Sequence, residues 1–118
     1  MSTTMTYRLL QQHATYLAAM APLELALGHV DQALAHSEEA VTALGALAAR
    51  GGDLLPHAWA QYVFAAIRAD AGTDTERALR AVEEAIQVLG RPHHAPHEQT
   101  QQHLSKALAV QATLLRLR

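Results

Sequence analysis

An internal repeat of 44–45 residues is the feature that most restricts how this chain can fold. When the sequence is shifted by 45 residues, residues 33–45 align with residues 78–90, and both copies read ALxxxEEA[VI]xxLG. Shifts of 44 and 40 residues align three histidines near the start of successive segments: His13, His57 and His97. A period of this length is typical of stacked units, because one unit alone cannot bury its apolar face.

The composition predicts that the stacked units are helical. Alanine (25 residues) and leucine (18 residues) supply most of the hydrophobic half of the chain, whereas aromatic residues make up only 4%. Alanine and leucine are strong helix formers, while strands are rich in β-branched and aromatic residues. A length of 118 residues suits one domain with its own core. We therefore expect a single all-α domain over residues 1–118.

Five helices are predicted from apolar periodicity and from glycine and proline positions. The first runs from about residue 4 to residue 27 with a kink or break at Pro22, and the second begins near Asp31. The third starts at Pro56, and Thr73-x-x-Glu76 is interpreted as a capping box that opens the fourth. Repeat one then covers about residues 9–50, repeat two about 54–90, and a capping helix about 97–117.

Small residues in both copies resemble the turn and second helix of the tetratricopeptide repeat (TPR) family. The matching positions are Gly28, Ala33 and Ala40 in one copy and Gly72, Ala78 and Ala85 in the other. In that family the alanines let paired helices approach closely. The long spacing is similar to kinesin-light-chain-type repeats of bacterial regulators. Roughly residues 13–117 share the resemblance, and three residues depart from it by replacing large apolar or aromatic side chains: Glu24, Ser37 and Arg68.

The resemblance implies a TPR-like α-α superhelix of about two and a half helix hairpins that binds a protein or peptide on its concave face. The first helix of each hairpin would line that groove. The groove residues carried over in the second and third units are Trp59, Tyr62, Ala66, Ala69, Gln99, Gln102 and Lys106. Those in the first unit are Thr15, Ala18, Pro22 and Leu25. The alternative for Trp59 and Tyr62 is that they pack between helices as part of the core.

Charge, cysteine content and apolar runs exclude several classes of partner. The net charge is −2 without a basic stripe, so we expect no nucleic acid partner. Cysteine is absent, which removes disulfides and thiolate metal sites. The N-terminus has no apolar signal-peptide region, and no apolar run reaches membrane-spanning length. We therefore expect no membrane association and a cytoplasmic location. Because arginine outnumbers lysine by eight to one, we expect the source to be a bacterium.

A histidine-rich loop is the main candidate for metal chemistry. His93, His94 and His97 offer three imidazoles within five residues, and imidazole is a common ligand of zinc, nickel and copper. The loop is proline-containing and brings no carboxylate at a fixed helical spacing before Glu98. We therefore favour a solvated loop over a functional metal site, with these three histidines as weak candidates.

No motif in the sequence indicates catalysis. A Gly-rich phosphate loop, a GxSxG elbow and an HExxH pair are all missing, so we expect neither an enzyme nor a cofactor. The expected function is a protein–protein interaction or scaffolding module. The alternatives are a helical ligand- or metal-binding regulatory domain and a small helical enzyme. Leucines in the last helix also leave open a homodimer through that apolar C-terminal helix.

Overall fold

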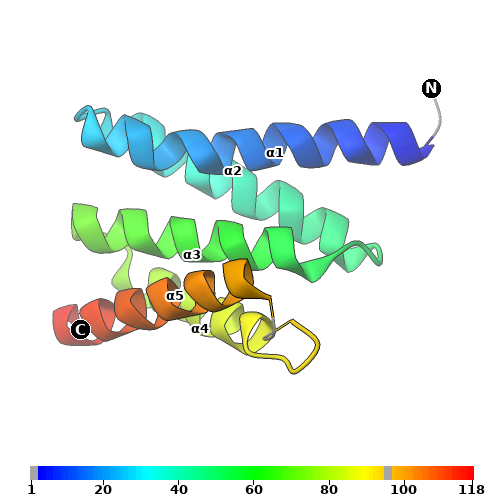
Figure 1. Ribbon diagram of the computed structural model, residues 1–118. Coiled ribbons are helices and arrows are strands. Elements are labelled where there is room, and N and C mark those ends of the chain that lie inside the picture. Colours follow the sequence, from blue (N-terminus) through cyan, green and yellow to red (C-terminus); the bar gives the residue numbers. More distant parts are fainter. Residues whose placement is uncertain (1–2, 95–96) are drawn as a thin grey trace.

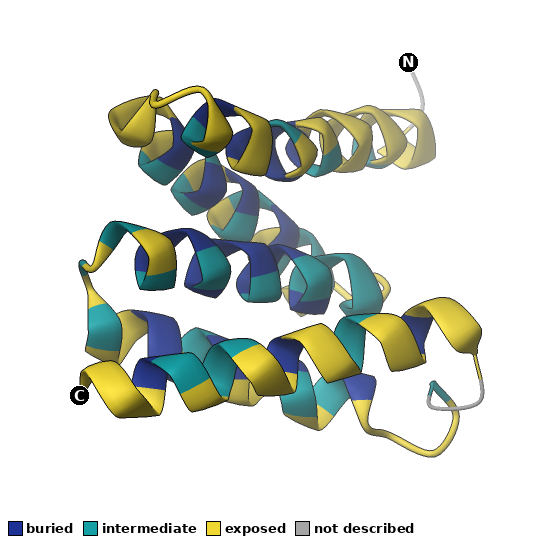
Figure 2. Ribbon diagram, turned by 60° about the vertical axis from the view of Figure 1, so that its left-hand side comes forward, coloured by how far each residue is buried: buried dark blue, intermediate teal, exposed yellow. Residues whose placement is uncertain are grey.

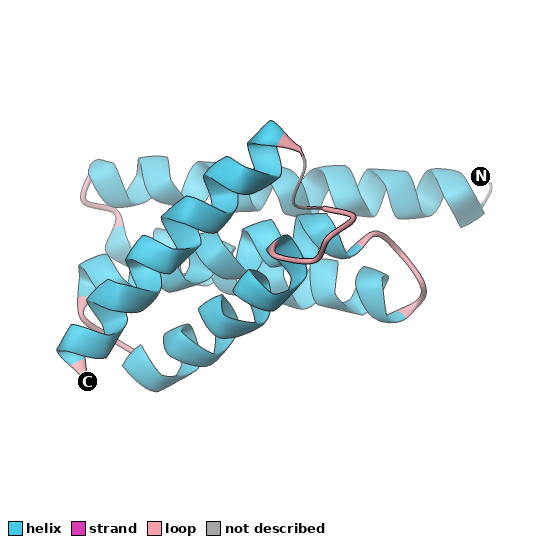
Figure 3. Cartoon of the chain, turned by 60° about the horizontal axis from the view of Figure 1, so that its bottom comes forward, coloured by secondary structure: helices cyan, strands magenta, loops and turns pink. Residues whose placement is uncertain are grey.

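The structure, a computed structural model, describes residues 3–94 and 97–118. Within these residues the chain forms five helices and no strand, which confirms the all-α prediction (Figures 1 and 3). The helices are α1 (Thr3–Ala26), α2 (Val30–Ala49), α3 (Leu54–Ala71), α4 (Thr75–Leu89) and α5 (Glu98–Leu117). No helix in the described part of the chain combines the length and the apolar character needed to cross a membrane.

The helices are arranged as two antiparallel hairpins followed by a single helix. α1 packs against α2, α3 packs against α4, and α5 closes the end of the array against α3 and α4. α1, α3 and α5 also pack side by side, so they form one layer and α2 and α4 form the other (Figure 1). The shortest dimension of 22 Å equals two helix diameters. This packing of neighbours is consistent with a helical repeat.

Buried alanines line the places where helices cross. In the first hairpin, Ala18 of α1 and Ala40 of α2 belong to the same buried cluster, and Ala21 and Ala33 share the next one. In the second hairpin the buried cluster contains Ala58 and Ala65 of α3, Ala78 and Ala85 of α4, and Ala107 of α5. A methyl side chain lets two helix backbones approach, so the repeated alanines of the sequence set the spacing of the layers.

Two helix starts differ from the sequence prediction. α3 begins at Leu54 rather than Pro56, because the carboxylate of Asp53 accepts a hydrogen bond from the Leu55 N–H (3.0 Å) and caps the helix two residues earlier. The Thr73-x-x-Glu76 capping box is wrong. α4 begins at Thr75 after Asp74, whose φ of 52° is left-handed and whose side chain makes no capping bond.

α1 runs without a break through Pro22, which the sequence predicts to kink or interrupt it. Proline removes one helical hydrogen bond and crowds the carbonyl of Ala18 four residues earlier. Ala18 and Ala21, in the turn that precedes Pro22, are fully buried. Their packing holds the helix together across the lost bond, and Pro22 itself stays on the surface.

The three residues that depart from the TPR pattern form buried polar contacts. Arg68 lies inside the fold, where its guanidinium donates to the Ser37 hydroxyl (2.8 Å) and to the Leu34 carbonyl (3.2 Å) of α2 and stacks 3.6 Å from the Phe64 ring centroid. Glu24 accepts a hydrogen bond from His36 Nδ1 at 2.7 Å. Polar pairs thus connect α1 to α2 and α2 to α3 at positions where the family resemblance predicts apolar packing.

Replacing Ala40 with leucine is expected to destabilise the protein by about 1–3 kcal/mol, because three additional carbons must fit between α1 and α2. Ala46→Leu on the exposed side of α2 is the matched control and should change stability little. Urea unfolding followed by circular dichroism measures both. Equal stability of the two variants would contradict close packing at Ala40.

Leu114→Ala tests whether α5 is docked. Leu114 is 0% exposed in the cluster shared with α3 and α4, so truncation is expected to cost about 2–3 kcal/mol of unfolding free energy. The adjacent Leu115 is 48% exposed, and Leu115→Ala should cost much less. Thermal melts of both variants give the comparison. A negligible effect of Leu114→Ala would mean that α5 does not pack as described.

Candidate functional site

A groove runs between α1 and α3, and two hollows follow one another along it. The first hollow, of about 280 Å³, lies at the end of the groove where α3 begins, and the second, of about 390 Å³, lies nearer the end of α3. Gln11 and Thr15 of α1 contribute to the first hollow, and Pro22 and Leu25 contribute to the second. The two hollows therefore follow one another along α1 and α3, and they share no lining residue.

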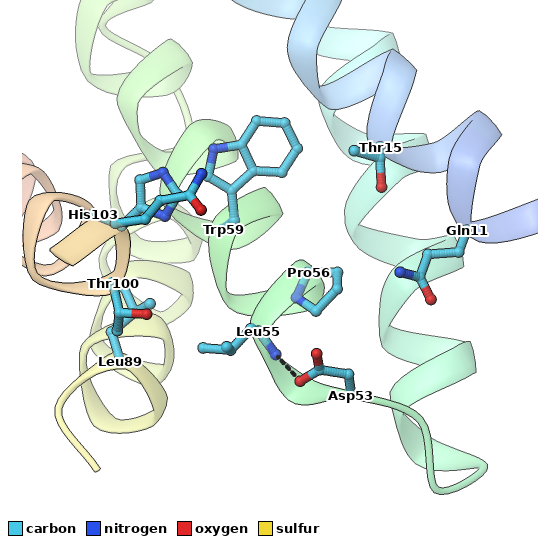
Figure 4. Close-up of a pocket in the computed structure, with 10 residues that line it drawn as sticks. Gln11, Thr15, Asp53, Leu55, Pro56, Trp59, Leu89, Thr100 and His103 are labelled. Carbon is cyan, nitrogen blue, oxygen red and sulfur yellow. Dashed lines mark hydrogen bonds between the residues drawn. The ribbon is translucent and has the colours of Figure 1, made fainter. Parts of the chain in front are cut away.

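The first hollow has a mixed lining, shown in Figure 4. The Trp59 indole and Pro56 lie on α3, Thr15 and Gln11 lie across the hollow on α1, and α5 adds Gln99, Thr100 and His103. Asp53 at the start of α3 is committed to its helix cap, with its carboxylate bonded to the Leu55 N–H (Figure 4). This end of the groove can offer hydrogen bonds beside one large aromatic surface.

The second hollow is mainly apolar. Its lining from α3 is Tyr62, Val63, Ala66, Ile67 and Asp70, and its lining from α1 is Pro22, Leu25 and Ala26. Asp70 is its one ionisable carboxylate and lies on the surface at the end of α3. The shape and lining suit an apolar side chain, with a negative charge at the rim.

His103 is one of the lining residues that the sequence prediction missed. It lies on α5 with its ring centroid 6.5 Å from that of Trp59 and 6.4 Å from that of Tyr62, nearly parallel to the tyrosine ring. Burial lowers the pKa of His103 below its usual value of 6.5, and the charge of Lys106 lowers it further. The repeat could not reveal this contact, because His103 has no aligned histidine in the first two units.

The predicted groove residues separate into two sets. Trp59, Gln99 and Thr15 line the first hollow. Tyr62, Ala66, Pro22 and Leu25 line the second. Gln102 and Lys106 are exposed on α5 and belong to the lining of neither hollow, whereas Ala69 packs toward α4 and α5. Ala18 is buried in the core.

Trp59 and Tyr62 have two roles in the structure. Both residues are half-buried. Trp59 packs against the two buried clusters formed by α1, α2 and α3. Tyr62 packs against one of these clusters and against the cluster formed by α3, α4 and α5. Their remaining surfaces line the hollows. From the sequence, core packing and groove lining are alternatives for these two residues. In the structure, each of them does both. Burial also raises the pKa of the Tyr62 hydroxyl.

The histidine-rich loop is connected to α4 by a backbone contact. His94 Nδ1–H donates to the Val88 carbonyl (2.9 Å), and the His93 and His94 rings lie 4.0 Å apart. His97 is exposed directly before α5, and residues 95 and 96 of the loop are outside the described residues. Among the residues that are described, no three histidine, aspartate or glutamate side chains are grouped as a metal site would require.

Some of the remaining repeated polar residues form contacts between helices, whereas His13 is exposed on α1. His57 packs against Gly45, and a Cβ added to Gly45 would lie 3.0 Å from the His57 Nε2 atom. Burial lowers the pKa of His57, and the negative charge of Glu84 partly opposes that shift. In the glutamate pairs, Glu38 forms a 2.7 Å salt bridge with Arg77. Glu84 accepts a 2.7 Å hydrogen bond from Gln61. Glu39 and Glu83 face solvent, as expected from the sequence.

The lowered pKa of His103 predicts a loss of stability in acid. Because the folded protein binds a proton at this site more weakly than the unfolded chain, the contribution is present above about pH 6.5 and is lost as the pH falls below it. The melting temperature of wild type should therefore fall more on acidification than that of His103→Gln, measured in the same buffers. Equal falls in the two proteins would contradict this assignment.

Comparisons with protein-family models, with curated proteins and with solved structures give no match for this chain. The groove is consequently interpreted from its own geometry and chemistry.

Proposed function

We propose that this protein is a TPR-like helical repeat that binds an extended peptide segment of a partner protein in the groove between α1 and α3. The supporting observation is that two hollows follow one another along the same two helices. From Gln11 to Ala26, α1 covers about 22 Å at 1.5 Å per residue. An extended chain of about seven residues spans the same length at about 3.3 Å per residue.

The lining of the groove supports a particular kind of peptide. The hollow formed by Pro22, Leu25 and Tyr62 accepts an apolar side chain, and burial of such a group is the main source of binding free energy. Trp59 and His103 present ring faces at the other hollow. Asp70 places negative charge at the apolar end, which favours a basic residue next to the apolar anchor.

The rigid aromatic side chains support recognition of a protein partner. Trp59 and Tyr62 occupy the central helix of the layer formed by α1, α3 and α5, so flanking residues can exclude water around them. Both side chains are held by core packing on one side, and a bound peptide would therefore meet a surface that is already ordered. We assign no reaction and no cofactor to the protein.

Selection of peptides from a random displayed library tests this proposal directly. We expect enriched sequences that combine an apolar residue with a nearby lysine or arginine. Tyr62→Ala should weaken the enriched peptides by about 1–3 kcal/mol, in the range of interface hot spots. Affinity is measured by calorimetry on samples whose melting temperature is also recorded, because Tyr62 contributes to the core.

Ala66→Glu provides a second variant that does not remove core packing. Ala66 is only half-buried and lines the second hollow, so the longer side chain should obstruct the hollow and abolish binding while the protein stays folded. Ala46→Glu, on the exposed side of α2, is the matched control and should bind as wild type does. Equal affinity of all three proteins, or a library without enrichment, would rule out the groove as the binding site.

A further inference from the structure

An exposed apolar stripe follows the side of α1 that faces away from the rest of the fold. It consists of Leu9, Tyr16 and Leu23 of α1 and Leu27 in the turn directly after it, which are 49%, 59%, 65% and 72% exposed. At 100° per residue these positions lie on the opposite side of the helix from its buried face, which includes Ala14, Leu17, Ala18 and Ala21. Figure 2 shows α1 at one edge of the molecule with exposed residues along most of its length.

The α1 stripe lacks the charges that normally cover a solvent-facing helix. Throughout α1, every residue of which is described, the only charged side chains are Arg8 and Glu24. Glu24 is buried and bonded to His36, so it does not contribute to the outer surface. A surface that is both apolar and nearly free of charge is suited to contact with another protein surface of the same character.

The spacing of the α1 stripe is symmetric about Tyr16. Leu9 and Leu23 lie seven residues to either side, and seven residues make two helical turns, so the three side chains form one line. Leu27 extends the line at one end, and the exposed Met5 lies at the equivalent distance on the other. A two-fold axis perpendicular to α1 at Tyr16 would place Leu9 of one copy against Leu23 of another.

We propose that the occupant of the α1 stripe is a second copy of this chain, paired with the first through antiparallel α1 helices. The same patch then serves both copies, as a closed two-fold interface requires. The stripe residues together with Met5 expose on the order of 500 Å² per copy, so pairing can bury up to about 1,000 Å² from these residues, the lower limit for a specific interface.

The antiparallel arrangement also separates the remaining charge. With Tyr16 on the axis, the two Arg8 side chains are about 24 Å apart along the helices, which exceeds the Debye length of about 8–10 Å. Parallel pairing would instead bring the two arginines together. The charge distribution therefore selects the antiparallel dimer.

The last helix is a weaker candidate for the same contact. α5 exposes Leu108, Leu115 and Leu117, as the sequence indicates. At 100° per residue, Leu108 and Leu115 share one side of α5, whereas Leu117 lies on the opposite side, so only two exposed leucines form a common patch. The dimer contact is therefore assigned to α1 rather than to the C-terminal helix.

Sedimentation equilibrium over a range of micromolar concentrations tests the dimer. Wild type should approach twice the chain mass of 12.8 kDa. Leu23→Glu should weaken association about tenfold or more, because it buries a carboxylate in an apolar contact. Leu115→Glu is the matched control, since this leucine on α5 is exposed to a similar extent and should leave the dimer intact. Circular dichroism checks that the helices are retained.

A charge-pair variant tests the antiparallel direction. In Leu9→Glu combined with Leu23→Lys, the introduced carboxylate of one copy faces the introduced ammonium of the other, so association should recover relative to either single substitution. A parallel pair would place like charges together and remain dissociated. A monomeric wild type, or a dimer lost with Leu115→Glu but retained with Leu23→Glu, would overturn the proposal.

Discussion

The close approach of helices at buried alanines is the constraint on which the rest of the structure depends. Ala18 and Ala40 in the first hairpin, and Ala78 and Ala85 in the second, are buried in the clusters where neighbouring helices pack. Because the same small residues recur in each unit, the two hairpins stack in the same way. The groove exists because α1 and α3 lie side by side in one layer as a result of that stacking.

Packing of alanine and leucine alone would allow more than one register between neighbouring helices. Buried polar contacts favour one of these registers. Arg68 binds the Leu34 carbonyl and the Ser37 hydroxyl, and its Nε atom has no hydrogen-bond partner within the described residues although the Asp74 carboxylate is 4.0 Å away. A buried guanidinium is costly unless it is paired, so a helix packed out of register would leave it unsatisfied. This arginine therefore favours a single register between α2 and α3.

The proposed groove and the α1 stripe occupy different sides of the same helix. Pro22 and Leu25 face α3 in the groove, whereas Leu9 and Leu23 face outward. A dimer through the stripe would leave both grooves open and directed antiparallel to each other. Two linked grooves would bind a partner with two peptide segments more strongly than one groove does, because the second contact becomes intramolecular.

The sequence by itself determined the helix content, the ends of most helices and the alanines at their crossings, because these depend on propensity, periodicity and glycine stops that are local in the chain. It also identified Trp59, Tyr62 and Ala66 as residues that line hollows between α1 and α3. The contact of His103 with both aromatic rings, the burial of Arg68 and the two hollows along α1 and α3 were decided only by the tertiary structure. Each joins residues from different helices, and the angle and register at which helices pack are set by all of their contacts together rather than by any local pattern.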